Sequence, residues 1–335
     1  MDILKYNPIE SLLESNNEPI IYFTNRDLKN KKVSKINEIW NMPEVQKILY
    51  KQQKDGSWKY TGKKAEMYPT YHYPLVETFK KFRNLVEKYE LNKSIDSCKK
   101  AAEYIFSCQT PSGDFRGLIG NQYATYYTGY FISLLIKAGY KEDKRIIKGL
   151  EWLLNMRQNE GGWTIPILTH YFDKETGYKL TSKKAKPVEP DRTQPFSHNW
   201  TNMVLMGFAE HPDYRYRPEI KKAAELMKSR FFQEDFYNSY KSRYYWVRFD
   251  FWWPNLLTAL ESLYKIGFRC NDEDISLGLR WFVTHQQKDG MWNIENNPNN
   301  KIKQNKKSQE KRLWLSLNIC RLLKKFYKKN YEGGC

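Results

Sequence analysis

The stretch Gln158-Asn-Glu-Gly161-Gly-Trp163 decides the fold, because its pattern Gln-x-x-Gly-x-Trp recurs along the chain. Two further copies run from Gln53 to Trp58 and from Gln287 to Trp292. A copy stretched by one residue ends in Phe, from Gln109 to Phe115, and a fifth place, from Gln233 to Phe236, keeps only the two ends. Most of the intervals between these glutamines are about fifty residues, and a period of this length indicates an array of helix pairs.

Each copy of the pattern is typical of a tight corner between two helices. A Gly just after a helix supplies the left-handed turn that satisfies the last carbonyls. The Trp two residues later buries a large apolar face over the turn, and the Gln can bridge backbone groups of the returning chain. We therefore expect Trp58, Trp163 and Trp292 to be structural residues.

The amphipathic segments around the corners predict an all-α protein of paired helices. Nothing shows strand alternation over a useful length. The first helices of the pairs are expected at 43–54, 95–109, 143–158, 217–233 and 273–287, and the second helices at 72–90, 121–138, 198–210, 254–267 and 310–328.

The repeats resemble those of squalene and oxidosqualene cyclases and of protein prenyltransferase β-subunits. The likeness rests on the stretches 149–163 and 278–292, where a Trp, Trp152 or Trp281, precedes the Gln by five or six residues. This resemblance implies an α/α toroid of about six helical hairpins, in which the first helices form an outer ring and the second helices line a central cavity. We expect a helical prefix at residues 1–40, the toroid at 41–330, and a long insertion at 164–197.

Composition narrows the class of protein further. The chain has 335 residues, a net charge of +18 and 16% aromatic residues, which is enough to fill a core and to line a cavity. The start of the chain is too polar for a signal peptide, and no apolar run approaches the ~20 residues that span a bilayer. The five cysteines form no C-x-x-C pair and indicate neither a zinc knuckle nor a disulfide framework. A cytoplasmic protein is expected, and peripheral contact with an anionic membrane surface stays open.

Two motifs that the resemblance would require are missing. Cyclases of this kind protonate an alkene with an Asp-x-Asp-Asp run at the start of an inner helix, but the matching places here read His198-Asn-Trp-Thr and Asp250-Phe-Trp-Trp. Protein prenyltransferases hold zinc through an Asp-x-Cys pair and a His, but Trp252 stands where the Cys is required. We expect no tightly bound metal and no cofactor, and the reaction stays unassigned.

Polar and aromatic residues still gather at the expected starts of the second helices. For proton transfer the candidates are Asp191, His198 and Asp250, since acidic and imidazole groups at a cavity mouth can move protons. For an anionic group they are Arg116 and Arg192. For an apolar or aromatic wall they are Tyr126, Trp200, Trp252 and Trp253, with His72 at the edge. We predict that Asp191, Arg192, His198, Asp250 and Trp252 face one cavity.

The function that best fits these expectations is the handling of an isoprenoid or terpenoid, with a hydrophobic small molecule as partner and no specific nucleic-acid binding. Two alternatives stay open. One is a polysaccharide lyase or hydrolase, which can also use an α/α toroid with aromatic platforms. The other is a lipid-binding or scaffold protein without catalysis.

Overall fold

The computed structural model describes residues 3–237, 242–249, 253–300 and 305–327. Its described part is all-α. The extended contacts found there are isolated bridges such as Gln52 with Trp58 and Gln109 with Phe115. The closed ring expected from the resemblance stays a prediction, because the chain divides into two compact units, residues 36–226 and residues 1–35 with 227–335.

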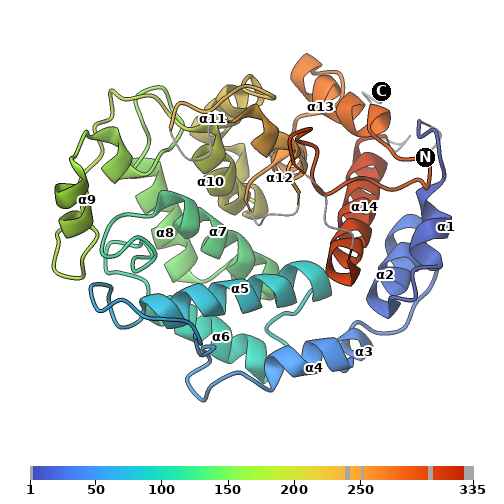
Figure 1. Cartoon of the computed structure of the whole chain (residues 1–335), viewed down its shortest axis with the longest axis horizontal. Coiled ribbons are helices and arrows are strands. Elements are labelled where there is room, and N and C mark those ends of the chain that lie inside the picture. Colours follow the sequence, from blue (N-terminus) through green and yellow to red (C-terminus); the bar gives the residue numbers. More distant parts are fainter. Residues whose placement is uncertain (1–2, 238–241, 250–252, 301–304, 328–335) are drawn as a thin grey trace. The chain divides into compact units, whose positions relative to one another are not determined.

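Within residues 36–226, hereafter unit 2, helices alternate between those that precede a corner and those that follow one (Figure 1). We call them leading and following helices. The leading helices are α4 (Pro43–Leu49), α6 (Asp96–Ser107), α8 (Lys144–Asn155) and most of α11 (Pro218–Lys228). The following helices are α5 (His72–Tyr89), α7 (Thr125–Leu135), which runs into η2 (Ile136–Tyr140), and α10 (His198–Glu210). Shorter elements are α3 (Asn37–Trp40), η3 (Pro166–Thr169), α9 (Lys174–Leu180) and η4 (Tyr214–Tyr216).

The other compact unit, unit 1, joins the two ends of the described chain. Its elements are α1 (Pro8–Leu13), α2 (Glu18–Phe23), η1 (Thr24–Leu28), η6 (Arg243–Val247), α12 (Leu256–Ile266), α13 (Glu273–Thr284) and α14 (Lys306–Phe326). All ten helices expected around the corners are therefore confirmed. The observed helices are shorter at several ends, most of all α4, because the corner residues leave the helical path before the Gly.

Four corners share one backbone geometry. Their glycines have φ between +80° and +118°, a conformation that favours glycine over residues with a side chain. In each corner the glycine amide donates to the carbonyl three residues earlier, and that residue's amide donates to the carbonyl just after the glycine. The four glycines are Gly56, Gly113, Gly161 and Gly290.

Corners also dock on the next element along the chain. The Gln52 side chain donates to the carbonyls of Gly56 and of Ser97 in α6, at 3.0 and 2.8 Å. Gln109 does the same in the next corner, with Gly113 and with Arg145 of α8. In these two corners the bridging glutamine lies four residues before the glycine, so the copy that begins at Gln109 is in register with Gln52. In the corner at Gly161 the bridging glutamine is Gln158, three residues before the glycine, and it donates to the carbonyls of Asp191 and Gln194.

The corner aromatics are core residues, as expected. Trp58, Phe115, Trp163 and Trp292 are at most 2% exposed. Each donates its backbone N–H to a Ser or Thr hydroxyl of the following helix, as Trp163 does to Thr201 at 2.8 Å. The fifth place differs, because Phe236 is 64% exposed.

In unit 1 the first helices of the chain pack on the last described one, since α1, α2 and η1 all contact α14 (Figure 1). The corner at Gly290 rests on the start of α1: a Cβ there would lie 2.8 Å from the carbonyl oxygen of Asn7. The Gln286 side chain both accepts from the Tyr6 amide and donates to the Tyr6 carbonyl. The residues before α1 therefore contact the corner at Gly290 in the same way that α6 contacts the corner at Gly56 and α8 contacts the corner at Gly113.

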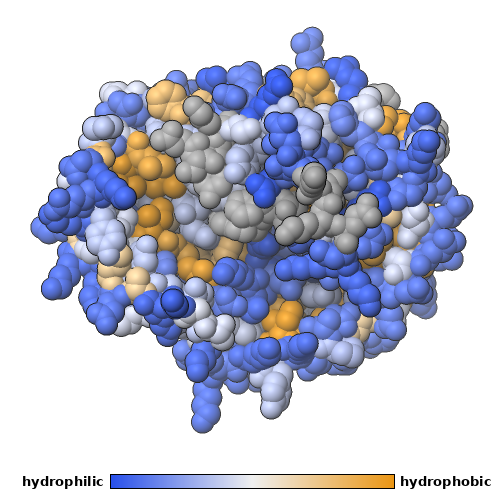
Figure 2. All heavy atoms as spheres, viewed as in Figure 1, coloured by the Kyte–Doolittle hydropathy of each residue, from blue (hydrophilic) through white to orange (hydrophobic). Residues whose placement is uncertain are grey.

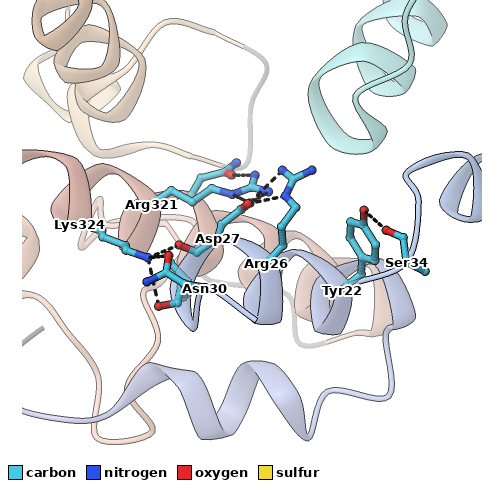
Figure 3. A network of polar contacts seen from close by, with 9 residues as sticks. Tyr22, Arg26, Asp27, Asn30, Ser34, Arg321 and Lys324 are labelled. Carbon is cyan, nitrogen blue, oxygen red and sulfur yellow. Dashed lines mark hydrogen bonds and ion pairs between the residues drawn. The ribbon is translucent and has the colours of Figure 1, made fainter. Parts of the chain in front are cut away.

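A polar clamp fastens η1 to α14 (Figure 3). The Asp27 carboxylate accepts hydrogen bonds from Arg26 and from Arg321 of α14. Lys324 donates to the Leu28 carbonyl at 3.2 Å and to the Asn30 side chain at 2.8 Å. Burial raises the pKa of Asp27, but the hydrogen bonds and positive charges of its two arginines outweigh this and leave it lowered. The carboxylate stays ionised and holds both arginines.

The surface in Figure 2 is hydrophilic over most of the view, with separate hydrophobic patches, as expected for a chain with 28% charged residues. None of the described helices is long and apolar enough to cross a bilayer. Cys98, Cys108 and Cys320 are free thiols.

Candidate functional site

The candidate site lies where the following helices α5, α7 and α10 of unit 2 begin. Helices α7 and α10 pack against each other so closely that their backbones touch. A Cβ on Gly129 would lie 2.5 Å from the Cα of Val204, and one on Gly207 would lie 2.6 Å from the carbonyl oxygen of Gly129. The two glycines therefore fix the spacing of the helices that carry Tyr126 and Trp200.

Five rings on these three helices form a continuous series, which we call the aromatic row: Trp200, Tyr126, Tyr127, Phe79 and Phe131. Successive ring centroids are 4.5, 4.5, 5.0 and 5.2 Å apart. Phe79 and Phe131 are core residues at 2% and 0% exposure, whereas Trp200, Tyr126 and Tyr127 keep 5–9%. The structure thus brings the predicted wall residues Tyr126 and Trp200 into contact.

In the chain just before α7, a series of polar contacts orients Arg116. The buried Asp114 accepts from Arg116 Nε at 2.9 Å, and the guanidinium lies 4.9 Å from the ring centroid of Tyr123. Tyr123 in turn donates its hydroxyl to Glu189 at 2.9 Å. Burial, together with this hydrogen bond and the charge of Glu189, raises the pKa of Tyr123 to about 12, so the phenol stays protonated.

His72 is the first residue of α5 and faces the same loop. Its Nδ1 contacts the carbonyl oxygen of Gly117, which has no proton, so Nδ1 carries the hydrogen and Nε2 keeps its lone pair. The ring stacks on Tyr68 with centroids 4.2 Å apart. Burial lowers the pKa of His72, partly opposed by the Gly117 hydrogen bond. The imidazole is therefore neutral at neutral pH and could accept a proton at Nε2.

The long segment 164–197 is tethered to the start of α7. Gln122, which is fully buried, donates to the carbonyls of Leu180 and Lys186 and accepts from the Val188 amide. A Cβ on Gly120 would collide with the carbonyl of Thr181. The segment therefore delivers Glu189 to Tyr123 through a fixed path along α7.

Asp191 and Arg192 both fasten this segment. The Asp191 carboxylate accepts from the Thr193 amide and hydroxyl and from Gln194. These bonds, with Thr193 as the largest cause, lower the pKa of Asp191. Arg192 donates to the carbonyl of Asn155, the last residue of α8. Such bonds are those of a loop anchor, and proton transfer by Asp191 and anion binding by Arg192 stay predictions.

The other predicted site residues divide between the units. His198 is 4% exposed and is the first residue of α10, two residues before Trp200. Trp253 is 3% exposed and belongs to unit 1. Asp250 and Trp252 lie outside the described residues, so the cavity predicted for them and His198 stays untested.

Sequence reasoning missed a charged cluster between the far ends of the same helices. Tyr130 donates to Glu87 at 3.1 Å, and Lys137 bridges Glu87 and Glu210 at 3.5 Å each. Arg83 approaches Glu87 at 3.8 Å. The i, i+4 spacing of Arg83 and Glu87 could have predicted their ion pair from the sequence. The contacts of Glu87 with Tyr130 and Lys137 depend on tertiary packing and could not. Across the described ranges, no group of three metal-binding side chains is found.

Comparisons with known proteins add little to this geometry. No family model matches the chain. Three solved structures are similar to it over most of its length. A crystal structure of a protein from Actinoplanes has 12% identity and a TM-score of 0.43, covering 87% of each chain. A variant of the type II terpene cyclase MstE from Scytonema, in complex with its product merosterolic acid A, has 12% identity and a TM-score of 0.33 over 87% of this chain and 97% of that one. The apo form of MstE has 13% identity and a TM-score of 0.30, over 86% and 96%. Likeness at this level does not identify a function.

The buried His72 predicts acid sensitivity. Because its folded-state pKa is lowered, the unfolded chain binds the proton more readily, so the unfolding free energy falls as pH drops below the unfolded pKa of about 6.5. His211, whose pKa burial also lowers, contributes in the same window. His72→Asn, whose amide can still donate to Gly117, should reduce the pH slope of urea unfolding between about pH 5 and 7. His285→Asn, at an exposed position after α13, is the control. An unchanged slope in His72→Asn would contradict the assignment.

Proposed function

We propose that the chain binds a hydrophobic, isoprenoid-type small molecule against the end of the aromatic row that Trp200 and Tyr126 form. The observation that carries this proposal is the pair Tyr126 and Trp200, whose rings are 4.5 Å apart and keep 7% and 5% exposure. Aromatic faces give a hydrocarbon chain a large apolar surface, and each buried methylene contributes about 0.8 kcal/mol. They also attract positive charge, which suits carbocation-forming ligands.

An anionic head group would find a partner in Arg116. Its guanidinium is oriented by Asp114 and by the Tyr123 ring, and its side chain keeps 18% exposure. The N-terminal ends of α5, α7 and α10 add partial positive charge in the same part of unit 2. A diphosphate-bearing isoprenoid therefore matches the charge at the start of these helices, and its tail matches the row.

The proposal is one of binding, with the reaction left open. His72 offers an unprotonated Nε2 for proton transfer. The corner repeats support the same class of protein, because they resemble those of cyclases and prenyltransferases. Contact with an anionic membrane surface stays a prediction, as does the division into a prefix at 1–40 and a toroid at 41–330.

The test is titration of the purified chain with farnesol and with farnesyl diphosphate, followed by tryptophan fluorescence. Both ligands should bind, and Trp200→Leu or Tyr126→Leu should weaken both by about tenfold or more, since each removes one ring of the contact. Trp281→Leu, in α13 of unit 1, is the matched control and should leave binding unchanged. Arg116→Gln should weaken farnesyl diphosphate selectively.

Two outcomes would contradict the proposal. One is no binding of either ligand by the full chain. The other is equal loss in Trp200→Leu and Trp281→Leu, with both variants folded by their melting curves. Native mass spectrometry of the purified chain would add an independent measurement, since a co-purified lipid would appear as a fixed mass increment.

A further inference from the structure

A recess lies in unit 2, lined by none of the residues of the aromatic row. It is formed by α3, α4 and the start of α6 and has a volume of about 430 Å³, within the ~300–1,000 Å³ range of small-molecule sites. We call it the amide groove. The lining residues that carry the argument are Asn37, Trp40, Asn41, Gln46, Tyr50 and Ile95.

No charged side chain lines the amide groove, although 28% of the chain is charged and its net charge is +18. The groove also presents no carboxylate or imidazole that could transfer a proton. Its chemistry is therefore that of recognition by hydrogen bonds and contact surface. A phosphate or carboxylate would find no counter-charge on its walls.

Unused hydrogen-bonding groups face this neutral recess. Asn37 and Asn41 are four residues apart in helical backbone, so their side chains lie on one face. Within the described ranges neither side-chain amide takes part in a hydrogen bond. Gln46 donates through Nε2 to the Trp40 carbonyl at 2.7 Å, which fixes its amide and leaves Oε1 as an acceptor. Each amide offers both donors and acceptors, the combination that hydroxyl groups require.

The aromatic side chains supply a floor and a platform. Trp40 is 6% exposed, and its indole donates to the Tyr89 carbonyl at 2.9 Å, so it forms a fixed floor. Tyr50, directly after α4, is 92% exposed. A sugar ring has an apolar C–H face that can lie on such a phenol ring and a hydroxyl rim that can meet the amides.

We propose that the amide groove binds a short neutral oligosaccharide. A neutral lining, free amides and an exposed ring together match a polyhydroxylated ligand better than an ionic or a purely apolar one. The site is a binding subsite and acts independently of the isoprenoid proposal, because its residues lie on α3, α4 and α6 and not on the row.

The test is isothermal titration of the full chain with maltotetraose, cellotetraose and chitotetraose. At least one should bind with a Kd of about 1 mM or tighter. Tyr50→Ala should weaken that binding by about tenfold or more, and Asn41→Ala should weaken it measurably. Tyr171→Ala is the control, because Tyr171 is 98% exposed on the segment 164–197 and outside the groove. Farnesol binding should be the same in Tyr50→Ala and in the parent chain.

The proposal is overturned if none of the three sugars binds at about 10 mM, or if Tyr50→Ala binds as tightly as the parent. Binding of a proline-rich decapeptide in place of the sugars would overturn it too, because aromatic grooves with amides can also hold extended peptides. All three variants replace exposed side chains, so their folds should survive and the comparison stays informative.

Discussion

Gly56→Ala is expected to lower the unfolding free energy by about 3 kcal/mol, although it adds a single methyl group. Gly56 has φ of +90°, where a residue with a Cβ is strained by about 1–3 kcal/mol. The added Cβ would also lie 2.1 Å from the carbonyl oxygen of Lys100 in α6. This neighbour is helix backbone, so the corner has to move away from α6 and the Gln52 bonds to Gly56 and Ser97 have to stretch.

The matched control is Gly177→Ala. Gly177 lies inside α9, and an added Cβ there would meet nothing within 4 Å. Alanine is the better helix former, so this change should be neutral or stabilising by up to ~1 kcal/mol. Urea unfolding followed by circular dichroism measures both. Equal effects of the two substitutions would show that the corner does not press on α6 as described.

Trp163→Ala is expected to cost about 4 kcal/mol. The side chain is fully buried, stacks on Phe208 with centroids 5.6 Å apart, and donates its indole N–H to the Leu153 carbonyl at 2.7 Å. Truncation leaves a large cavity and an unpaired carbonyl, and buried Trp-to-Ala changes cost about 3–5 kcal/mol. Trp163→Phe keeps most of the ring and should cost less, chiefly the hydrogen bond at about 1 kcal/mol.

A larger loss of unfolding free energy in Trp163→Ala than in Trp163→Phe is the result expected if Trp163 packs in the core and does not contact a ligand. The measurement is urea unfolding of both variants beside the farnesol titration. If Trp163→Ala abolished ligand binding and left the melting temperature unchanged, the corner tryptophans would belong to a binding site and the structural assignment would be wrong.

The helices could be predicted because the corner pattern is local. The pattern combines a Gly, an aromatic residue two positions later and an amphipathic run on each side, and all of these lie close together in the sequence. The position of the bridging glutamine within the corner was harder to predict. Gln52 and Gln53 are adjacent, and only the bond from Gln52 to Ser97, in a different helix, shows which of them bridges. A sequence pattern cannot separate two neighbouring glutamines when the deciding acceptor lies on a distant segment.

The candidate site was predicted in part. His72, Arg116, Tyr126 and Trp200 were singled out because polar and aromatic residues gather at the expected starts of helices, and their role in binding stays a prediction. The partner of Tyr123, Glu189, could not be assigned to it, because their contact depends on the path of the long segment past Gln122. Asp191 and Arg192 drew attention as a charged pair, but the sequence alone could not show that Thr193 and Gln194 engage Asp191 or that Arg192 donates to the carbonyl at the end of α8.

Because α1 and α2 pack on α14, they cannot complete their packing until α14 has been synthesised. Residues 3–28 are synthesised before unit 2, yet their partners in α14 and at Gln286 are synthesised only after the whole of unit 2. Unit 2 is complete once residue 226 has emerged, whereas Phe23 and Leu28 have to wait for residues up to Phe326. During that interval the apolar faces of α1 and α2 are uncovered, and a nascent chain at this stage would be a substrate for chaperones that hold exposed hydrophobic helices.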